Sequence, residues 1–322
     1  MRVSSNMFFN ANAISSQRAQ TLMLKAQQQL SSNSKLQTAA DNPTDAVQVM
    51  RTNQNLAEID QYRSASRQAQ TRLELSEGGL SSMSSMVVRA RELAVQLGND
   101  ALSTGARQAI GKEAASLLQS MVAAANSKDA NGESAYAGYL SKVSPVGQDV
   151  SGNWVYQSDD NIRRVRISDT RDLPASVPAS AIFFDPSMPL ADANGYTLYD
   201  SMTGQPLPDS IFATLKSLVD LSQTPANTSV GPGVQGIIQR IGNFSDRILT
   251  ARADVGAMLG EVEAAQNAFD DSDLYLKTYK SGLQDIDLAE AITRFTQQQT
   301  VLQATQQSFT RIQGLSLFNY LQ

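Results

Sequence analysis

The side chains of this chain that could carry chemistry are carboxylates, amines and guanidinium groups, because the sequence contains no histidine and no cysteine. This excludes histidine-based triads, thiol nucleophiles, disulfides and the usual zinc sites. Catalysis by paired carboxylates stays open in principle, and a glycosidase or peptidase within residues 141–208 is the enzymatic alternative. No carboxylate pair there has a supporting motif. We therefore predict no enzyme, no cofactor and no metal site.

Two charged clusters have the spacing of possible ligand sites. Asp270, Asp271 and Asp273 resemble the start of a calcium loop but lack its glycine and distal glutamate, and their pattern is typical of a solvated helix face. The arginines at 163, 164 and 166 are interpreted as solvated strand residues. Trp154 is predicted to lie in the core of a β-rich region.

Composition narrows the classes of partner. The net charge is −5, only 18% of the 322 residues are charged, and no basic stripe stands out, so nucleic-acid binding is not expected. No run of 18 apolar residues is present, so no membrane span is predicted. The apolar run at residues 7–9 is too short for a secretory signal.

Large apolar residues recur every seven positions near the C-terminus. Leu288, Phe295, Leu302 and Phe309 form this row, and Ile292 and Ile312 accompany it. Such a row predicts a helix that lies along another helix. The intervening positions are rich in glutamine, and no charged residue occurs between 294 and 311, so we expect this helix to be covered on most sides. Leu317, Phe318 and Leu321 extend the same candidate surface.

A second amide-rich helix is predicted near the N-terminus, over residues 11–32. Leu22, Met23 and Leu30 lie at helical spacing on it. Because its composition matches that of the C-terminal helix, we expect the two to pair.

Residues 33–42 interrupt the helical pattern, and the next helix starts after them. Asn33 suits a left-handed backbone, Asn42 suits an N-cap, and Pro43 fits the first helical position. Asp41 belongs to the same predicted turn. A long helix is expected from Pro43 to about residue 97, with a bend at residues 78–79.

Beyond residue 128 turn residues and short β-type runs replace the helical pattern, including residues 154–156, 165–167 and 181–184. Helices resume near residue 209, and a long one is expected over 234–279 with an interruption at Gly282. Asp287 and Glu290 have the spacing of a capping box.

The predicted fold is mainly α with a β-rich insert. The N- and C-terminal helices pair as a coiled coil, long helices form a bundle, and the β-rich part is a small outer domain. The expected domains are a terminal coiled-coil (inner-core) domain of residues 1–42 and 283–322, a helical rod domain of 43–140 and 209–282, and a β-rich outer domain of 141–208.

Several motifs, in order at both ends of the chain, resemble the bacterial flagellin superfamily. They are the segments 30–35 with 40–46, 91–96, 132–138, 252–257 and the ending 316–321. The ending is similar to the branch that forms the hook–filament junction rather than to flagellin itself. Asn33 and Asn42 depart from the residues common in the family, Gly and Asp, but both keep the expected backbone role.

The resemblance implies a structural, extracellular protein of the flagellum, exported unfolded through the flagellar type III channel. Its implied partners are further copies of itself in a layer, hook-associated protein 1, flagellin and an export chaperone. The terminal helices are expected to be disordered or chaperone-held in the free chain and to pair after export. Asp41 and Pro43 either only start a helix or also contact a neighbouring copy. A short flagellin is the alternative within the superfamily.

Overall fold

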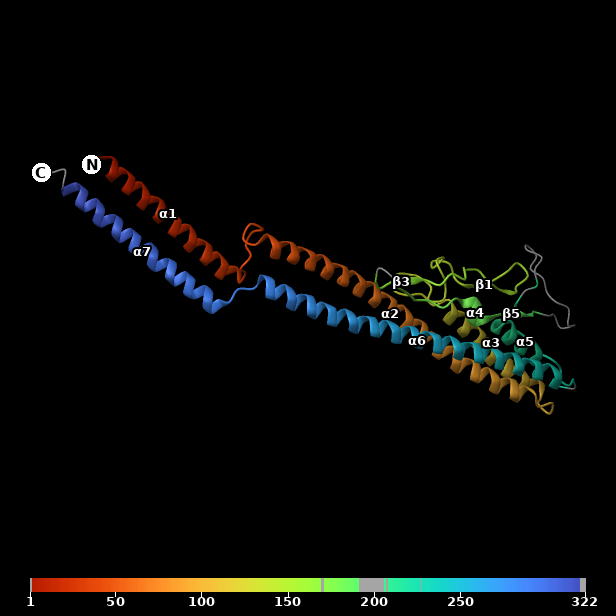
Figure 1. Cartoon of the computed structure of the whole chain (residues 1–322). Helices are drawn as coiled ribbons and strands as arrows, with labels where there is room; N and C mark the ends of the chain where they lie inside the picture. The colour runs from red at the N-terminus through yellow and green to blue at the C-terminus, as the bar shows by residue number, and fades with distance from the viewer. Residues whose placement is uncertain (1, 169–170, 191–205, 207, 227, 319–322) are drawn as a thin grey trace. The chain divides into compact units, whose positions relative to one another are not determined.

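The computed structural model describes residues 2–168, 171–190, 206, 208–226 and 228–318 (Figure 1). Its helices are α1 (Arg2–Ser32), α2 (Pro43–Leu97), α3 (Thr104–Ala125), α4 (Ala179–Phe183), α5 (Ile211–Ser222), α6 (Gly231–Gln284) and α7 (Leu288–Phe318). Its strands are β1 (Val146–Gln148), β2 (Trp154–Tyr156), β3 (Arg164–Arg166), β4 (Asp172–Pro174), β5 (Phe184–Pro189) and β6 (Pro208–Ser210). The strands pair in antiparallel hairpins, β1 with β2, β3 with β4 and β5 with β6. The predicted fold class, helical with a small β-rich insert, is confirmed.

The chain divides into two compact units, residues 1–60 with 270–322, and residues 61–269. Both boundaries of the second unit fall inside the long helices α2 and α6. The three-part division proposed above, with boundaries near residues 42, 140, 208 and 282, stays a prediction.

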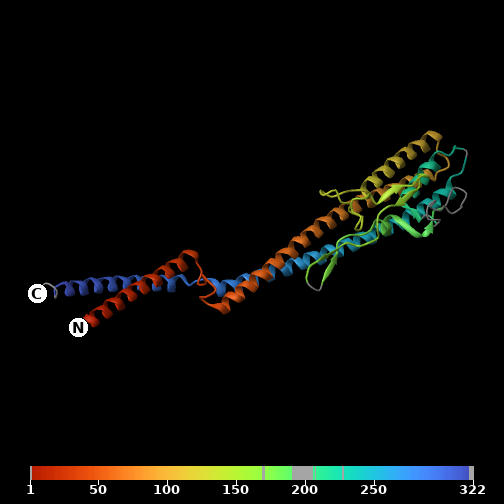
Figure 2. The same cartoon turned by 90° about the horizontal axis from the view of Figure 1, so that it is seen from above.

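In the first unit, α1 packs along α7 (Figures 1 and 2). The covered positions on α7 alternate in steps of three and four, as in a coiled-coil seam. Ala291 and Leu302 are buried, and the positions between and beyond them at the same spacing are half-buried. Ala19 and Ala26 are the buried residues of α1. Three of the four buried seam residues are therefore alanines.

The two breaks between helices are joined to each other within this unit. Asn33 takes a φ of 52°, which confirms the predicted left-handed turn after α1. Ser34 forms an isolated antiparallel bridge with Asp285, and the Lys35 amide donates to the Gln284 carbonyl at 2.8 Å. The predicted interruption at Gly282 is wrong, since α6 continues to Gln284 and the Gly282 carbonyl accepts a hydrogen bond from Lys35 Nζ at 2.9 Å.

In the second unit, α2 and α6 run antiparallel, with α3 and α5 packed on each other beside them (Figure 2). Leu73, Leu80 and Val87 are almost completely buried, which confirms their predicted place in the core of the long helices. Polar contacts tie the two helices together at intervals. Arg252 donates to Glu77 through two nitrogens, and the side-chain amides of Gln70 and Gln266 bond at 2.9 Å.

Helix α2 is unbroken through residues 78–79, and the bend expected there stays a prediction. Gly79 has a packing role. The buried Tyr136 hydroxyl lies over it and donates to the Ser76 carbonyl at 2.9 Å, and a Cβ on Gly79 would lie 2.2 Å from that oxygen. Gly78 has open space around it.

Aromatic side chains form the core of the insert. The rings of Phe183 and Phe212 lie 5.8 Å apart, and Trp154 and Tyr136 pack at 5.6 Å from Phe212 and 5.5 Å from Phe183. Trp154 is half-buried at the edge of this cluster, as predicted for the core of the β-rich region. The strand predicted for 181–184 is wrong in part, because these residues end helix α4 and only Phe184 begins β5.

Candidate functional site

Those residues proposed for subunit contacts that the structure describes lie on the α1–α7 pair, but the pair buries only some of them. Leu302 is buried, and Met23, Leu30, Phe295 and Phe309 are half-buried. Helices α1 and α7 pack on each other as predicted, and these side chains lie at covered positions of the pair.

Other proposed contact residues stay outside the seam. Leu22, Leu288 and Ile292 have 44%, 52% and 55% of their surface exposed, while the neighbouring alanine at 291 is buried instead. The heptad row therefore faces the partner helix only from Phe295 onward, and the first helical residue of α7 points to solvent. The side chains of Ile312, Leu317 and Phe318 and the whole of Leu321 lie outside the described residues.

The proposed turn residues form a compact hydrogen-bonded loop. The Asp41 carboxylate accepts from the Gln37 and Thr38 amides at 3.0 and 2.9 Å and from the ammonium of Lys25 on α1. The bond from Lys25, followed by that from Thr38, lowers the pKa of Asp41 to about 2. Asp41 thus fixes the loop to α1 as well as preceding the next helix.

Capping residues start both helices that follow the breaks. Asn42 Oδ1 accepts from the Asp45 amide at 3.2 Å, and Pro43 is the first residue of α2, as predicted. Asp287 accepts from the Ala289 and Glu290 amides at 2.9 and 3.2 Å. The second half of the predicted capping box is not formed, because the Glu290 carboxylate pairs with the arginine one turn on.

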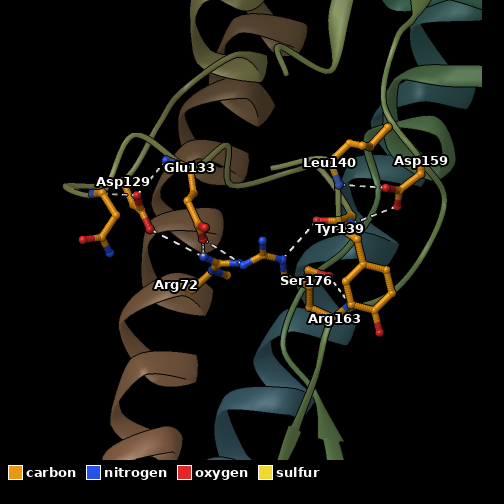
Figure 3. Close-up of polar contacts among 10 residues, drawn as sticks. Arg72, Asp129, Glu133, Tyr139, Leu140, Asp159, Arg163 and Ser176 are labelled. Atoms are coloured by element: carbon orange, nitrogen blue, oxygen red, sulfur yellow. Dashed lines mark hydrogen bonds and ion pairs between the residues drawn. The ribbon is translucent and has the colours of Figure 1, made fainter. Parts of the chain in front are cut away.

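A polar hub, made of Arg72, Asp129, Glu133 and Arg163, fixes the insert to α2 (Figure 3). One oxygen of Glu133 contacts two guanidinium groups, that of Arg72 on α2 and that of Arg163 just before β3, the latter at 2.8 Å. These bonds, first from Arg163 and then from Arg72, lower the pKa of Glu133 to about 2. Asp129 lies 3.6 Å from Arg72 and adds a second negative charge.

The loop that carries Glu133 has a conformation fixed by hydrogen bonds and by a left-handed glycine. Asp129 Oδ1 accepts from the Asn131 and Glu133 amides at 2.8 and 2.9 Å, and Gly132 takes a φ of 75°. A side chain at Gly132 would strain this left-handed position. The loop therefore aims the Glu133 carboxylate across to α2.

A second carboxylate orders the neighbouring turn. Asp159 accepts from the Tyr139 and Leu140 amides at 3.0 and 2.8 Å, and a Cβ on Gly138 would lie 1.8 Å from its Oδ1 (Figure 3). Arg163 Nε donates to the Gly138 carbonyl at 3.0 Å. The turn and the hub are thus one connected network, and Tyr139 beside it stays 63% exposed.

Sequence reasoning missed this hub. Arg163 is not a solvated strand residue, since it is half-buried and bonded to Glu133, whereas Arg164 and Arg166 are exposed as predicted. The available signal was the glycine that precedes Glu133 in the motif at 132–138. In the acidic cluster, Asp271 is exposed, and Asp273 accepts from the lysine one turn on at 2.8 Å.

Two further observations concern the described residues only. Over these ranges, no His, Cys, Asp and Glu side chains gather in threes where a metal ion could be held. None of the helices found there is both long and apolar enough to cross a membrane.

Two family models match the chain, one at each end. The bacterial flagellin N-terminal helical region matches residues 3–141, and the bacterial flagellin C-terminal helical region matches residues 238–321. The first contains α1 to α3 and the loop of the hub, and the second contains most of α6 and α7. Together they match more than half of the chain.

Individual relatives agree over the full length. The chain is 28% identical to flagellar hook-associated protein 3 of Escherichia coli strain K12, over 99% of both chains. It is 27% identical to flagellar hook-associated protein 3 of Salmonella typhimurium strain LT2, again over 99% of both. Among solved structures, the flagellar junction protein FlgL of Legionella pneumophila superposes with a TM-score of 0.58 at 19% identity, covering 75% of this chain and all of that one. The chain belongs to the bacterial flagellin family.

Proposed function

We propose that this protein is a structural subunit of the bacterial flagellum that forms the junction between hook and filament. Its full-length similarity to flagellar hook-associated protein 3 from two species favours this function over the alternative, a short flagellin. Its role is mechanical rather than catalytic.

The observation that carries the proposal is the apolar surface left on the α1–α7 pair. Large apolar side chains are exposed on both helices, although the two helices are already packed on each other. Exposing such residues costs free energy that burial against a neighbour would recover, about 1.5–3 kcal/mol for each large side chain that becomes fully buried. Apolar surface that is exposed in one subunit is characteristic of protein–protein contacts when it gathers in patches. The exposed residues are Met7, Ile14, Leu22, Leu24, Leu288, Ile292 and Val301.

The partners follow from the same surface. Copies of the chain pack side by side through their α1–α7 pairs, with hook-associated protein 1 on one side of the layer and flagellin on the other. The subunit travels through the flagellar type III channel, aided by an export chaperone, and the pair forms its full set of contacts only outside the cell. The glutamine-rich, uncharged surfaces of both helices suit positions covered by other subunits.

The test is deletion of the gene followed by complementation. We expect cells without the protein to keep their hooks and to release flagellin monomers into the medium. A short flagellin would instead give hooks capped by junction proteins, with no flagellin lost, and that result would reject the proposal.

Single substitutions then test the apolar surface. Ile292→Glu should fail to restore filaments, because it places a charge where a neighbour must pack. Thr293→Glu, at the next exposed position of the same helix, is the matched control and should restore them. Equal restoration by both variants would show that Ile292 lies outside the subunit contact.

A further inference from the structure

A basic pocket lies between α2 and the insert, next to the polar hub. Its volume is about 840 Å³, and its walls are residues 68–75 of α2, the loop 128–133, Tyr139 and the start of β3. This volume is within the range of pockets that hold a ligand or a segment of a partner.

The pocket carries more positive than negative charge, although the whole chain is acidic. Its walls include Arg72, Lys128, Arg163 and Arg164 against the carboxylates of Asp129 and Glu133. The hub neutralises two of these cations. In the part of the chain that the structure describes, the side chains of Lys128 and Arg164 are exposed and have no hydrogen-bond or ion-pair partner.

The complementary charge lies on α6. Between residues 253 and 276 the sequence has six acidic residues and no lysine or arginine. Within the second unit, Asp254, Glu261 and Glu263 belong to this stretch and are exposed. Glu261 is paired with Arg171 at 3.4 Å. The carboxylates of Asp254 and Glu263 have no partner among the described residues.

The pocket and the acidic stretch lie at the same level of the α2–α6 pair. Gln70 beside Gln266 and Glu77 beside Arg252 set the register of the two antiparallel helices. Residues 68–75, which line the pocket, therefore run alongside residues 252–266. A neighbour rotated about an axis parallel to these helices keeps this level. Its α6 is then at the height of the pocket, as a head-to-tail contact between copies requires; contacts of this kind close a ring or continue a helix.

We propose that this pocket is a lateral contact between copies of the chain, occupied by the acidic stretch of α6 from the adjacent subunit. The inference rests on the proposed function, since it needs copies side by side in one layer. Lys128 and Arg164 form ion pairs with the neighbour's Asp254 and Glu263, and the exposed Tyr139 side chain covers the contact. Because Arg72 and Arg163 are held by the hub, the lining stays in place before the neighbour arrives.

Cysteine cross-linking tests the contact directly, because the chain has no cysteine of its own. Cells would produce two variants together, Arg164→Cys and Glu263→Cys, and their isolated flagella would be treated with a short bis-maleimide, because an arginine–glutamate pair separates the Cα atoms by more than a disulfide spans. We expect a covalent dimer of the two chains, and only monomers from cells producing either variant alone. Arg164→Cys combined with Asp220→Cys, an exposed acidic position on α5, is the matched control and should give no dimer. Flagella that contain both chains of the first pair without a dimer would overturn the proposal.

Charge reversal provides a second test, in which the two charges of the proposed ion pair are exchanged between the two positions. Arg164→Glu and Glu263→Lys should each cause a several-fold loss of filaments per cell, and the double variant should restore most of them. Single variants without effect, or a double variant no better than either, would overturn the contact. Failure of the proposed function looks different, because deletion of the gene would then leave hooks capped by junction proteins, with no flagellin released into the medium, whatever the outcome of these exchanges.

Discussion

Replacing Glu133 by glutamine should destabilise the second unit, because it removes the charge that holds two guanidinium groups together. The folded carboxyl has a pKa of about 2 against an ordinary value of 4.5. One unit corresponds to about 1.4 kcal/mol, so the shift sets an upper limit of roughly 3 kcal/mol. Water reaches part of the site, since 26% of the Glu133 side chain is exposed. We therefore expect a loss of about 1–2 kcal/mol at pH 7.

The loss should depend on pH in a defined direction. The pKa of Glu133 is lower in the folded than in the unfolded chain, so its contribution is complete above about pH 4.5. It disappears as the pH falls through about 2, where both states are protonated. The parent protein should therefore lose its advantage over the Glu133→Gln variant between these limits.

Urea unfolding followed by tryptophan fluorescence is a suitable assay, since Trp154 is the only tryptophan and lies in the second unit. Glu113→Gln is the matched control, because Glu113 pairs with Arg89 at an exposed site and its loss should barely move the unfolding midpoint. An unchanged midpoint for Glu133→Gln at pH 7 would refute the reasoning. So would a difference from the parent that persists undiminished at pH 2.

Three other perturbations give distinct outcomes. Gly79→Ala should cost about 1–3 kcal/mol in urea unfolding, because its methyl group meets the buried tyrosine hydroxyl above it. Gly78→Ala, with open space, should instead gain about 1 kcal/mol, and equal effects would contradict the packing role. Leu302→Ala should speed proteolysis of the terminal helices, whereas Gln303→Ala, at the next and exposed position, should not. Similar rates for the two would place Leu302 outside the seam. In an NMR titration the carboxyl of Asp41 should have its midpoint at about pH 2, and Lys25→Met should raise it toward 3.8. A midpoint unmoved by that substitution would mean that the backbone bonds alone lower the pKa.

Features set by a few neighbouring residues were predictable from the sequence. The left-handed turn at Asn33 and the caps at Asn42 and Asp287 all formed as expected. Each depends on the backbone preference or the side-chain reach of one residue over one turn. Such signals do not need knowledge of the rest of the fold.

Features set by distant residues were not predictable in this way. Glu133 meets partners 61 and 30 residues away in sequence, and no local pattern encodes that encounter. The apolar run at 181–184 has the same limitation, because a short buried run fits a helix end as well as a strand. Tertiary contacts determine which residues are helix and which are strand here, since Phe183 and Phe184 are both buried but belong to different elements.

The terminal helices show a third case, in which the heptad period was correct but the length of helix over which the row is covered was not. The row containing Phe295, Leu302 and Phe309 does face α1, but Leu288 does not. A heptad specifies which residues share a face, and the partner's own surface decides where along the helix that face becomes covered. At the start of α7 the covered residue is Ala291, while Leu288 and Ile292 stay exposed.

The joined helix breaks have a mechanical consequence. Lys35, just after α1, is bonded to the last turn of α6 through its amide and its ammonium, while the chain itself continues into α2. A pull or twist applied to α1 is therefore shared between two long helices rather than passed to one. In a rotating flagellum, each subunit would transmit torque from α1 through two connections, one to α2 and one to α6. A single peptide connection at the same place would allow α1 to rotate freely.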